Sequence, residues 1–146
     1  MRILGIDFGD RNIGLALSDF LKLTAQPLST YQPKSKKTED RDFFLELVRT
    51  RQIDEIVVGF PLRMDGTPGS RVEKTRAFAK WLEAAVRVPI IFWDERLTTH
   101  QAINVAHEQK VRLKTKKSVI NQISAAIILQ SYLDSRRSDA RIHQDR

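Results

Sequence analysis

The chain has 146 residues, a formal net charge of +7 at pH 7 and no cysteine. Its length suffices for one domain with a real core, and the absence of cysteine excludes disulfides, thiolate metal sites and a cysteine nucleophile. No apolar run approaches the ~18 residues that a membrane span needs, and the N-terminus lacks the layout of a signal peptide, so we expect a cytoplasmic protein. The excess of lysine and arginine favours a polyanionic partner, because these cations gain affinity by releasing counterions from phosphates.

Residues 3–19 predict a β-hairpin that carries one acid. Its first strand is almost wholly apolar, as is typical of a strand in the middle of a sheet, but Asp7 interrupts it. After a turn over residues 9–12, large apolar residues alternate with small ones over residues 13–18, which is strand periodicity. A carboxylate in a core strand loses its hydration unless a partner or a metal replaces the water. Asp7 therefore serves either a ligand or the backbone of the turn.

The next segments predict a third strand followed by a helix. The strand covers residues 24–31 and contains Pro27, which suits an edge position because proline has no N–H to donate. Thr38 is expected to cap the helix, which has acids in its first turn and runs to about Gln52.

Two further apolar strands are predicted over residues 56–58 and 88–93. Between them, Ser70 and Glu73 form a possible capping box at the start of a helix that ends near Val86.

The rest of the chain predicts helices. One begins at Thr98 or Thr99, regular patterning fails over residues 108–117, and a last helix runs from Ser118 to Leu133. A hairpin, an edge strand and strands alternating with helices together predict one α/β domain with a mixed five-stranded sheet over residues 1–134. We expect residues 135–146 to be a polar tail, frayed or disordered.

A pair of acids, Asp94 and Glu95, follows the strand over residues 88–93. In open α/β sheets the functional crevice lies outside the carboxyl ends of the strands. Side chains alternate along a strand, so only one of these two acids can lie on the same face as Phe92. If one of them meets Asp7, the two carboxylates repel each other unless a divalent cation lies between them. Such a pair with Mg²⁺ or Mn²⁺ in a basic protein suggests phosphodiester hydrolysis. The alternative is that the pair only serves the first turn of the next helix.

Residues 110–117 hold five cations in eight positions. The simplest interpretation is a solvated loop, but the lack of balancing acids favours contact with a phosphate backbone. The expected nucleic-acid-binding residues in this segment are Lys110, Arg112, Lys114, Lys116 and Lys117. We expect Arg11, Arg63, Arg71 and Arg96 to add to the same surface.

The last predicted helix presents a polar residue at the start of an inward-facing stripe. Asn121, Ala125, Ile128 and Tyr132 follow one another at spacings of four, three and four, so they share one helix face. The ordinary role for Asn121 there is an amide that hydrogen-bonds backbone or water.

With these residues assembled, the chain resembles the YqgF/RuvX family of pre-16S rRNA nucleases, which are also described as Holliday-junction-resolvase-like. The resemblance covers about residues 2 to 134, and four linked blocks in the family's order make it specific. These blocks are GIDFGDRNIGLALSD at 5–19, VVGFPLRMDGTPG at 57–69, DERLTT at 94–99 and SAAIILQSYLD at 124–134.

The resemblance implies a ribonuclease H-like fold and divalent-metal nuclease chemistry that matures the 5′ end of small-subunit ribosomal RNA. By the family pattern, Asp7 is the first metal and catalytic ligand and Glu95, or Asp94, is the second. The third acid belongs where this chain has Asn121. An amide oxygen can coordinate Mg²⁺ but brings no charge and cannot act as a base. Asn12 also stands where a basic residue is expected, with Arg11 as a possible compensation.

Three functions remain open from the sequence. The leading one is a Mg²⁺- or Mn²⁺-dependent endonuclease acting on structured RNA or branched DNA, as a monomer or a homodimer. The second is a nucleic-acid-binding module whose catalysis is weakened or lost because of Asn121. The third is nucleotide binding of the actin and sugar-kinase type, which the short chain and the lack of a second phosphate loop disfavour.

Overall fold

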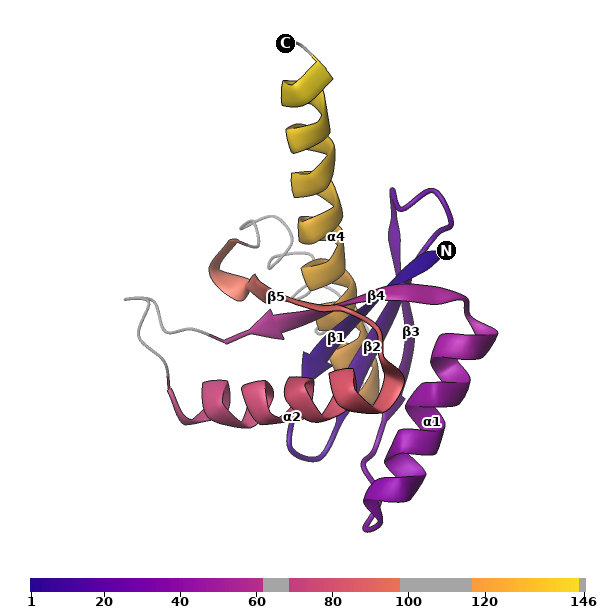
Figure 1. The fold of residues 1–146 in the computed structure, drawn as a ribbon. Helices are drawn as coiled ribbons and strands as arrows, with labels where there is room; N and C mark the ends of the chain where they lie inside the picture. The colour runs from indigo at the N-terminus through magenta and orange to yellow at the C-terminus, as the bar shows by residue number, and fades with distance from the viewer. Residues whose placement is uncertain (62–68, 98–116, 145–146) are drawn as a thin grey trace.

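The computed structural model describes residues 1–61, 69–97 and 117–144, and it describes only the backbone of residues 96, 117–118 and 138–144. The predicted helix from Thr98 or Thr99 lies outside these ranges. The elements in chain order are β1 (Arg2–Phe8), β2 (Ile13–Ser18), β3 (Ala25–Tyr31), α1 (Lys37–Thr50), β4 (Ile53–Phe60), α2 (Ser70–Val86), β5 (Ile90–Asp94), the 3₁₀ turn η1 (Glu95–Leu97) and α4 (Lys117–Gln144) (Figure 1).

The five strands form one mixed sheet in the order β3-β2-β1-β4-β5. β1 pairs antiparallel with β2, and β2 with β3, whereas β1–β4 and β4–β5 are parallel. The predicted mixed five-stranded sheet is therefore confirmed, with β1 near its centre. β3, which carries Pro27, is an edge strand as predicted.

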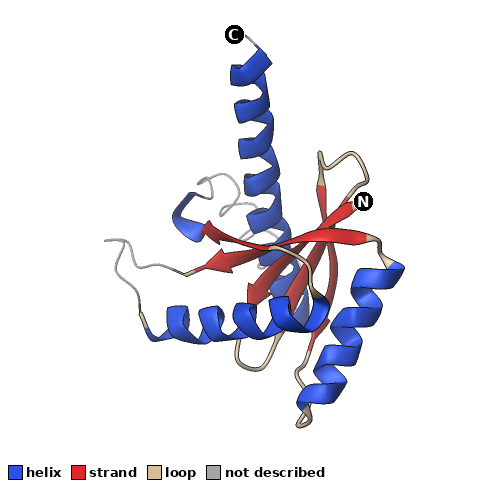
Figure 2. Ribbon diagram, viewed as in Figure 1, coloured by secondary structure: helices blue, strands red, loops and turns tan. Residues whose placement is uncertain are grey.

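Helices cover both faces of the sheet (Figures 1 and 2). α1 and α2 pack on one face, where Phe44, Leu82 and the large apolar residues of the central strands form one core cluster. α4 covers the other face, where Ala125, Leu129 and Leu133 pack against Ile3, Ala16 and Val57. A Cβ on Gly5 or on Gly14 would stand less than 3 Å from atoms of α4, so α4 lies close to β1 and β2.

Because side chains alternate along a strand, successive residues of β1 lie on opposite faces of the sheet. Leu4 and Ile6 belong to the cluster beneath α1 and α2. Ile3 belongs to the cluster beneath α4, and a Cβ on Gly5 would stand 2.7 Å from the Cβ of Leu129. Because side chains alternate along a strand, Asp7 lies on the α4 face.

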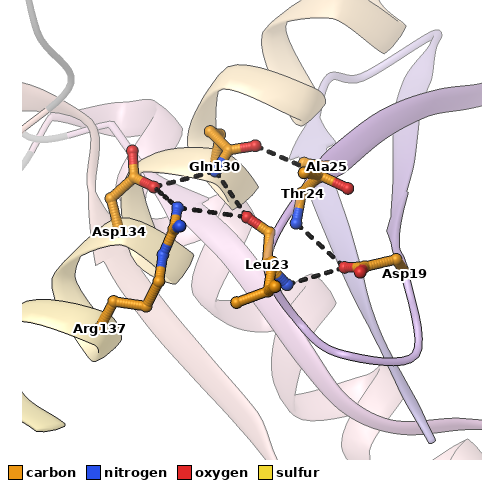
Figure 3. Close-up of polar contacts among 7 residues, drawn as sticks. All are labelled: Asp19, Leu23, Thr24, Ala25, Gln130, Asp134 and Arg137. Carbon is orange, nitrogen blue, oxygen red and sulfur yellow. Dashed lines mark hydrogen bonds and ion pairs between the residues drawn. The ribbon is translucent and has the colours of Figure 1, made fainter.

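The C-terminal half of α4 is attached to the β2–β3 connection through Gln130 (Figure 3). The Gln130 amide oxygen accepts a hydrogen bond from the Ala25 N–H at 2.9 Å, and its nitrogen donates to the Leu23 carbonyl at 3.1 Å. Asp19 accepts hydrogen bonds from the N–H groups of Leu23 and Thr24, at 2.7 and 3.0 Å, which orders the turn that Gln130 contacts. These bonds satisfy backbone groups that no strand partner reaches.

Two predicted helix caps are wrong. α1 begins at Lys37, so Thr38 lies inside the helix. The buried Asp40 anchors this end instead, because its carboxylate accepts hydrogen bonds from the Lys34 N–H at 2.8 Å and the Tyr31 hydroxyl at 2.6 Å. α2 begins at Ser70, with Gly69 as an N-cap that makes no side-chain bond, so the capping box is absent.

Several element ends also differ from the prediction, and β4 spans Ile53–Phe60 rather than residues 56–58. β5 begins at Ile90 rather than at residue 88, because Pro89 has no N–H for the ladder. α4 continues to Gln144, so residues 135–144 are helical rather than an irregular tail. They contain no glycine or proline, and an ion pair of 2.5 Å between Asp134 and Arg137 supports the helix where the extension begins. Within the described ranges, no helix combines the length and apolar character that crossing a membrane requires.

Candidate active site

Asp7 lies near the carboxyl end of β1, on the α4 face of the sheet. It is partly buried, and it stands opposite Gly14 in the β1–β2 ladder. Directly opposed residues of an antiparallel pair point to the same face, so a glycine at position 14 leaves the space beside Asp7 free of a second side chain.

Glu95 reaches the same face from the other side of β1. It is the first residue after β5, and Trp93, two residues earlier, packs with the cluster under α4. A Cβ on Gly59 would stand 2.8 Å from the Glu95 Oε1 atom, so the glycine gives the carboxylate its room. Asp94 pairs in register with Phe60, and alternation directs its side chain to the opposite face. Glu95 rather than Asp94 therefore joins Asp7.

The electrostatics show that these two carboxylates share one environment. Burial and the negative charge of Glu95 raise the pKa of Asp7 from 3.8 to about 7. Burial also raises the pKa of Glu95, and the charge of Asp94 adds to that effect. The positive charge of Arg71 opposes both shifts by lowering each pKa. A cation bound between these two carboxylates would offset both their lost hydration and their mutual repulsion.

The first turns of α2 bring cations to the same place. Arg71 donates a hydrogen bond of 3.3 Å to the carbonyl oxygen of Phe8, the residue that follows Asp7. Lys74 forms an ion pair of 3.3 Å with Asp10 in the turn between β1 and β2. The sequence predicts Arg71 as a nucleic-acid contact, and the structure places it beside the two carboxylates.

The backbone of Asn121, near the start of α4, lies against Gly14 beside this group. Its backbone carbonyl and its Cβ occupy the space in which a Cβ of residue 14 would stand. Because Gly14 is paired with Asp7, this contact carries the start of α4 to the carboxylate site. Sequence reasoning places Asn121 at the start of an inward stripe, and Ala125 and Ile128 of that stripe are buried.

The two carboxylates, Asp7 and Glu95, suit a small, hard cation that prefers oxygen ligands. Mg²⁺ is commonly held by one or two carboxylates together with waters and substrate phosphates, and Asp7 and Glu95 supply that number. Within the described residues there is no group of three or more acidic, histidine or cysteine side chains placed to hold a metal.

The other predicted nucleic-acid contacts are less well defined. Arg11 is exposed in the turn between β1 and β2. Arg96 lies in η1 and Lys117 is the first residue of α4, but their side chains are outside the description. Five predicted contacts fall in ranges that the structure leaves undescribed: Arg63, Lys110, Arg112, Lys114 and Lys116.

Sequence reasoning missed three residues that shape the site. Gly14 and Gly59 admit Asn121 and Glu95, and Lys74 holds the turn that follows Asp7. The alternation of large and small residues in β2 was the available signal for Gly14. No local pattern indicates Lys74, because its partner Asp10 is 64 residues away.

The described fold belongs to the ribonuclease H-like class, and Holliday junction resolvases of known structure share this fold. A structure titled "T. thermophilus RuvC in complex with Holliday junction substrate" matches with a TM-score of 0.59 and 16% identity over 94% of this chain and 96% of that one. The fowlpox virus resolvase, in complex with Holliday junction DNA, matches with a TM-score of 0.56 and 18% identity over 92% and 98% of the two chains. Identities this low establish the fold alone.

Sequence comparison identifies the family within that class. The profile described as "RuvX: Holliday junction resolvase" matches residues 1–135. A relative from Syntrophus aciditrophicus is 47% identical over 92% of this chain and 89% of its own length, and one from Listeria monocytogenes is 42% identical over 92% and 99%. Both carry the name "Putative pre-16S rRNA nuclease". The chain therefore belongs to the RuvX family.

Proposed function

We propose that this protein is a divalent-metal-dependent endonuclease that hydrolyses phosphodiester bonds in processing the 5′ end of precursor 16S ribosomal RNA. The observation that carries the proposal is the meeting of Asp7 and Glu95, from β1 and the end of β5, on one face at the carboxyl edge of the sheet. The names of the relatives supply the class of substrate.

Asp7 and Glu95 would hold Mg²⁺ or Mn²⁺, with the amide oxygen of Asn121 as a weaker, neutral ligand. A cation held there would supply charge that polarises the scissile phosphate and lowers the pKa of the attacking water. In the hydrolysis the water oxygen forms a bond to phosphorus, the P–O bond to the leaving oxygen breaks, the water gives a proton to solvent, and the leaving oxygen takes up a proton from solvent.

We expect Arg71 to contact the substrate in addition to its hydrogen bond to the Phe8 carbonyl. Its guanidinium lies near enough to lower the pKa of both carboxylates, although the side chain is largely exposed. An arginine can bind a phosphate through two parallel hydrogen bonds. We assign to Arg71 the positioning of the scissile phosphate beside Asp7 and Glu95, and to Arg11 and the basic segment 110–117 contacts to the phosphate backbone farther away.

The test is cleavage of a precursor 16S rRNA and a four-way DNA junction side by side with Mn²⁺. We expect the RNA to be cut at the 5′ side and Asp7→Ala to abolish the cut. Asp10→Ala is the matched control, because it removes a nearby exposed carboxylate whose partner is Lys74. Cleavage that survives Asp7→Ala would remove Asp7 from the mechanism, and cleavage of the DNA junction alone would replace RNA as the substrate.

Metal binding is measured separately from cleavage. A cation held by this site would bind the folded protein and not the unfolded chain, so the Tm of the wild type and of Asp10→Ala should rise with Mn²⁺ concentration, roughly with its logarithm above the Kd. Asp7→Ala should lose this response. An equal rise in all three proteins would show that the cation binds elsewhere.

A further inference from the structure

A second surface lies along the edge strand β5, on the face of the sheet opposite Asp7 and Glu95. It is a shallow groove of about 410 Å³ between α2 and the edge strand β5, and Arg76, Lys80, Glu83 and Phe92 are among its lining residues. This volume is within the range of about 300–1,000 Å³ that ligand sites occupy.

The groove presents an aromatic side chain to solvent. Phe92 is 41% exposed, although it lies within a strand. Its ring packs against that of Phe60 with 4.8 Å between ring centroids and an interplanar angle of 51°. Phe60 supports one side of the Phe92 ring, so Phe92 is held in place by its neighbour while part of its surface remains open.

Two cationic side chains of α2 line the same groove. The Arg76 guanidinium carbon lies 5.5 Å from the centroid of the Phe60 ring, within the distance of a cation–π contact. Lys80 follows Arg76 by four residues, so both side chains lie on the face of α2 that lines the groove. Glu83 is the one acid among the lining residues named here, so the groove carries a net positive charge.

The groove is next to the carboxylate site along the chain. Phe60 follows Gly59, whose missing Cβ makes room for Glu95, and Phe92 precedes Glu95 by three residues. The chain segments that carry Gly59 and Glu95 therefore also carry the two phenylalanines, on the opposite face of the sheet.

We propose that this groove binds an unpaired stretch of nucleic acid that flanks the cleaved bond, with one base stacked on Phe92 and neighbouring phosphates bound by Arg76 and Lys80. An exposed, supported aromatic ring beside cations is how proteins bind single strands without reading their sequence. The inference rests on the proposed function for its choice of partner, but it concerns binding and not the chemical step.

The experiment measures binding in the absence of divalent cations, so that no cleavage takes place. Fluorescently labelled single-stranded RNA and DNA of the same sequence, and the RNA duplex, are titrated with the full chain and followed by anisotropy. Phe92→Ala should raise the Kd for the single strands by about 5- to 150-fold, the effect of one lost base stack. Phe92→Tyr should retain wild-type affinity, and the RNA and DNA arms show which backbone is preferred.

Salt dependence separates the stacking contact from the phosphate contacts. Lys80→Gln should reduce the slope of log Kd against log salt by about 0.7, the value for one phosphate contact on a single strand. Phe92→Ala should leave that slope unchanged. Phe20→Ala is the matched control, since Phe20 is 56% exposed and has Arg2 over its ring at 4.4 Å, but lies in the β2–β3 connection. It should bind as the wild type does.

Wild-type affinity in Phe92→Ala, or an equal loss in Phe20→Ala, would overturn the inference. If Phe92→Ala lowers the Tm enough to unfold the protein, Phe92→Leu replaces it under the same criterion. The proposed nuclease function would be contradicted by a different result. In that case neither RNA nor DNA is cut in the presence of Mn²⁺, by the wild type or by any variant of residue 92. Cleavage with unchanged single-strand binding in Phe92→Ala would reject the groove alone.

Discussion

The backbone carbonyl of Asn121 occupies the space in which any side chain at Gly14 would begin. Since Gly14 is the ladder partner of Asp7, this contact determines how near α4 comes to the carboxylate site. The packing of α4 against Gly14 therefore affects both the core cluster beneath α4 and the position of α4 relative to Asp7.

Gly14→Ala should push the first turn of α4 away from β2. The added methyl group overlaps backbone, which cannot move aside as a flexible side chain can, so we expect a loss of about 1–3 kcal/mol in the free energy of unfolding. The Tm increase on adding Mn²⁺ should also fall, because Asn121 moves with the helix. Urea unfolding and thermal melts with and without Mn²⁺ measure the two effects. Unchanged values in both would mean that the contact does not position α4.

Asp7→Asn should stabilise the metal-free protein above neutral pH. Because the native pKa of Asp7 is raised from 3.8 to about 7, the folded state binds this proton more tightly than the unfolded state. The free energy of unfolding of the wild type therefore falls as pH rises from about 4 to about 7, by roughly 4 kcal/mol at most. The amide lacks this penalty, so the gain in Asp7→Asn is full near pH 8 and vanishes near pH 4.

Urea unfolding in EDTA over this pH range measures the effect of Asp7→Asn. Asp10→Asn serves as the control, because it makes the same chemical change at an exposed position in the adjoining turn. A stabilisation that is equal at pH 4 and pH 8, or that appears in both variants, would contradict the raised pKa as its cause.

Asn121→Asp should strengthen metal binding and cleavage. A third carboxylate raises the charge of the ligand set, for which we expect an increase of about tenfold or more in Mn²⁺ affinity. The metal-free variant should be less stable at neutral pH, because like charges crowd together. Gln122→Glu adds the same charge one position along the helix and should leave metal affinity unchanged. Equal affinity in Asn121→Asp and the wild type would show that residue 121 is not a ligand position.

Gln130→Ala should loosen the attachment of α4 to the β2–β3 connection. It removes the acceptor of the Ala25 N–H and the donor to the Leu23 carbonyl, and we expect a loss of about 1–3 kcal/mol in the free energy of unfolding. Gln26→Ala, at an exposed position on β3, should change stability by less than about 0.5 kcal/mol. If urea unfolding shows that the two variants are equally stable, the prediction is wrong.

Local pattern was sufficient for most of the elements. Strand alternation and apolar runs indicated all five strands, and Pro27 indicated an edge position, because these features depend on neighbours in the sequence. Helix caps were less predictable. Thr38 and Ser70 have the residue types of caps, but Asp40 binds across to Tyr31 and Lys34, and that contact depends on how β3 approaches α1.

Sequence pattern alone placed Asp7 in a central strand, an acidic pair at the carboxyl end of the last strand, and Asn121 near the start of the final helix. Only the tertiary structure decided that Glu95 rather than Asp94 meets Asp7, because that choice depends on the register of β5 against β4. It also decided that Arg71 lies beside them. Local periodicity reports the face on which a side chain lies, whereas its partners depend on strand register and on how closely helices approach glycines such as Gly14 and Gly59.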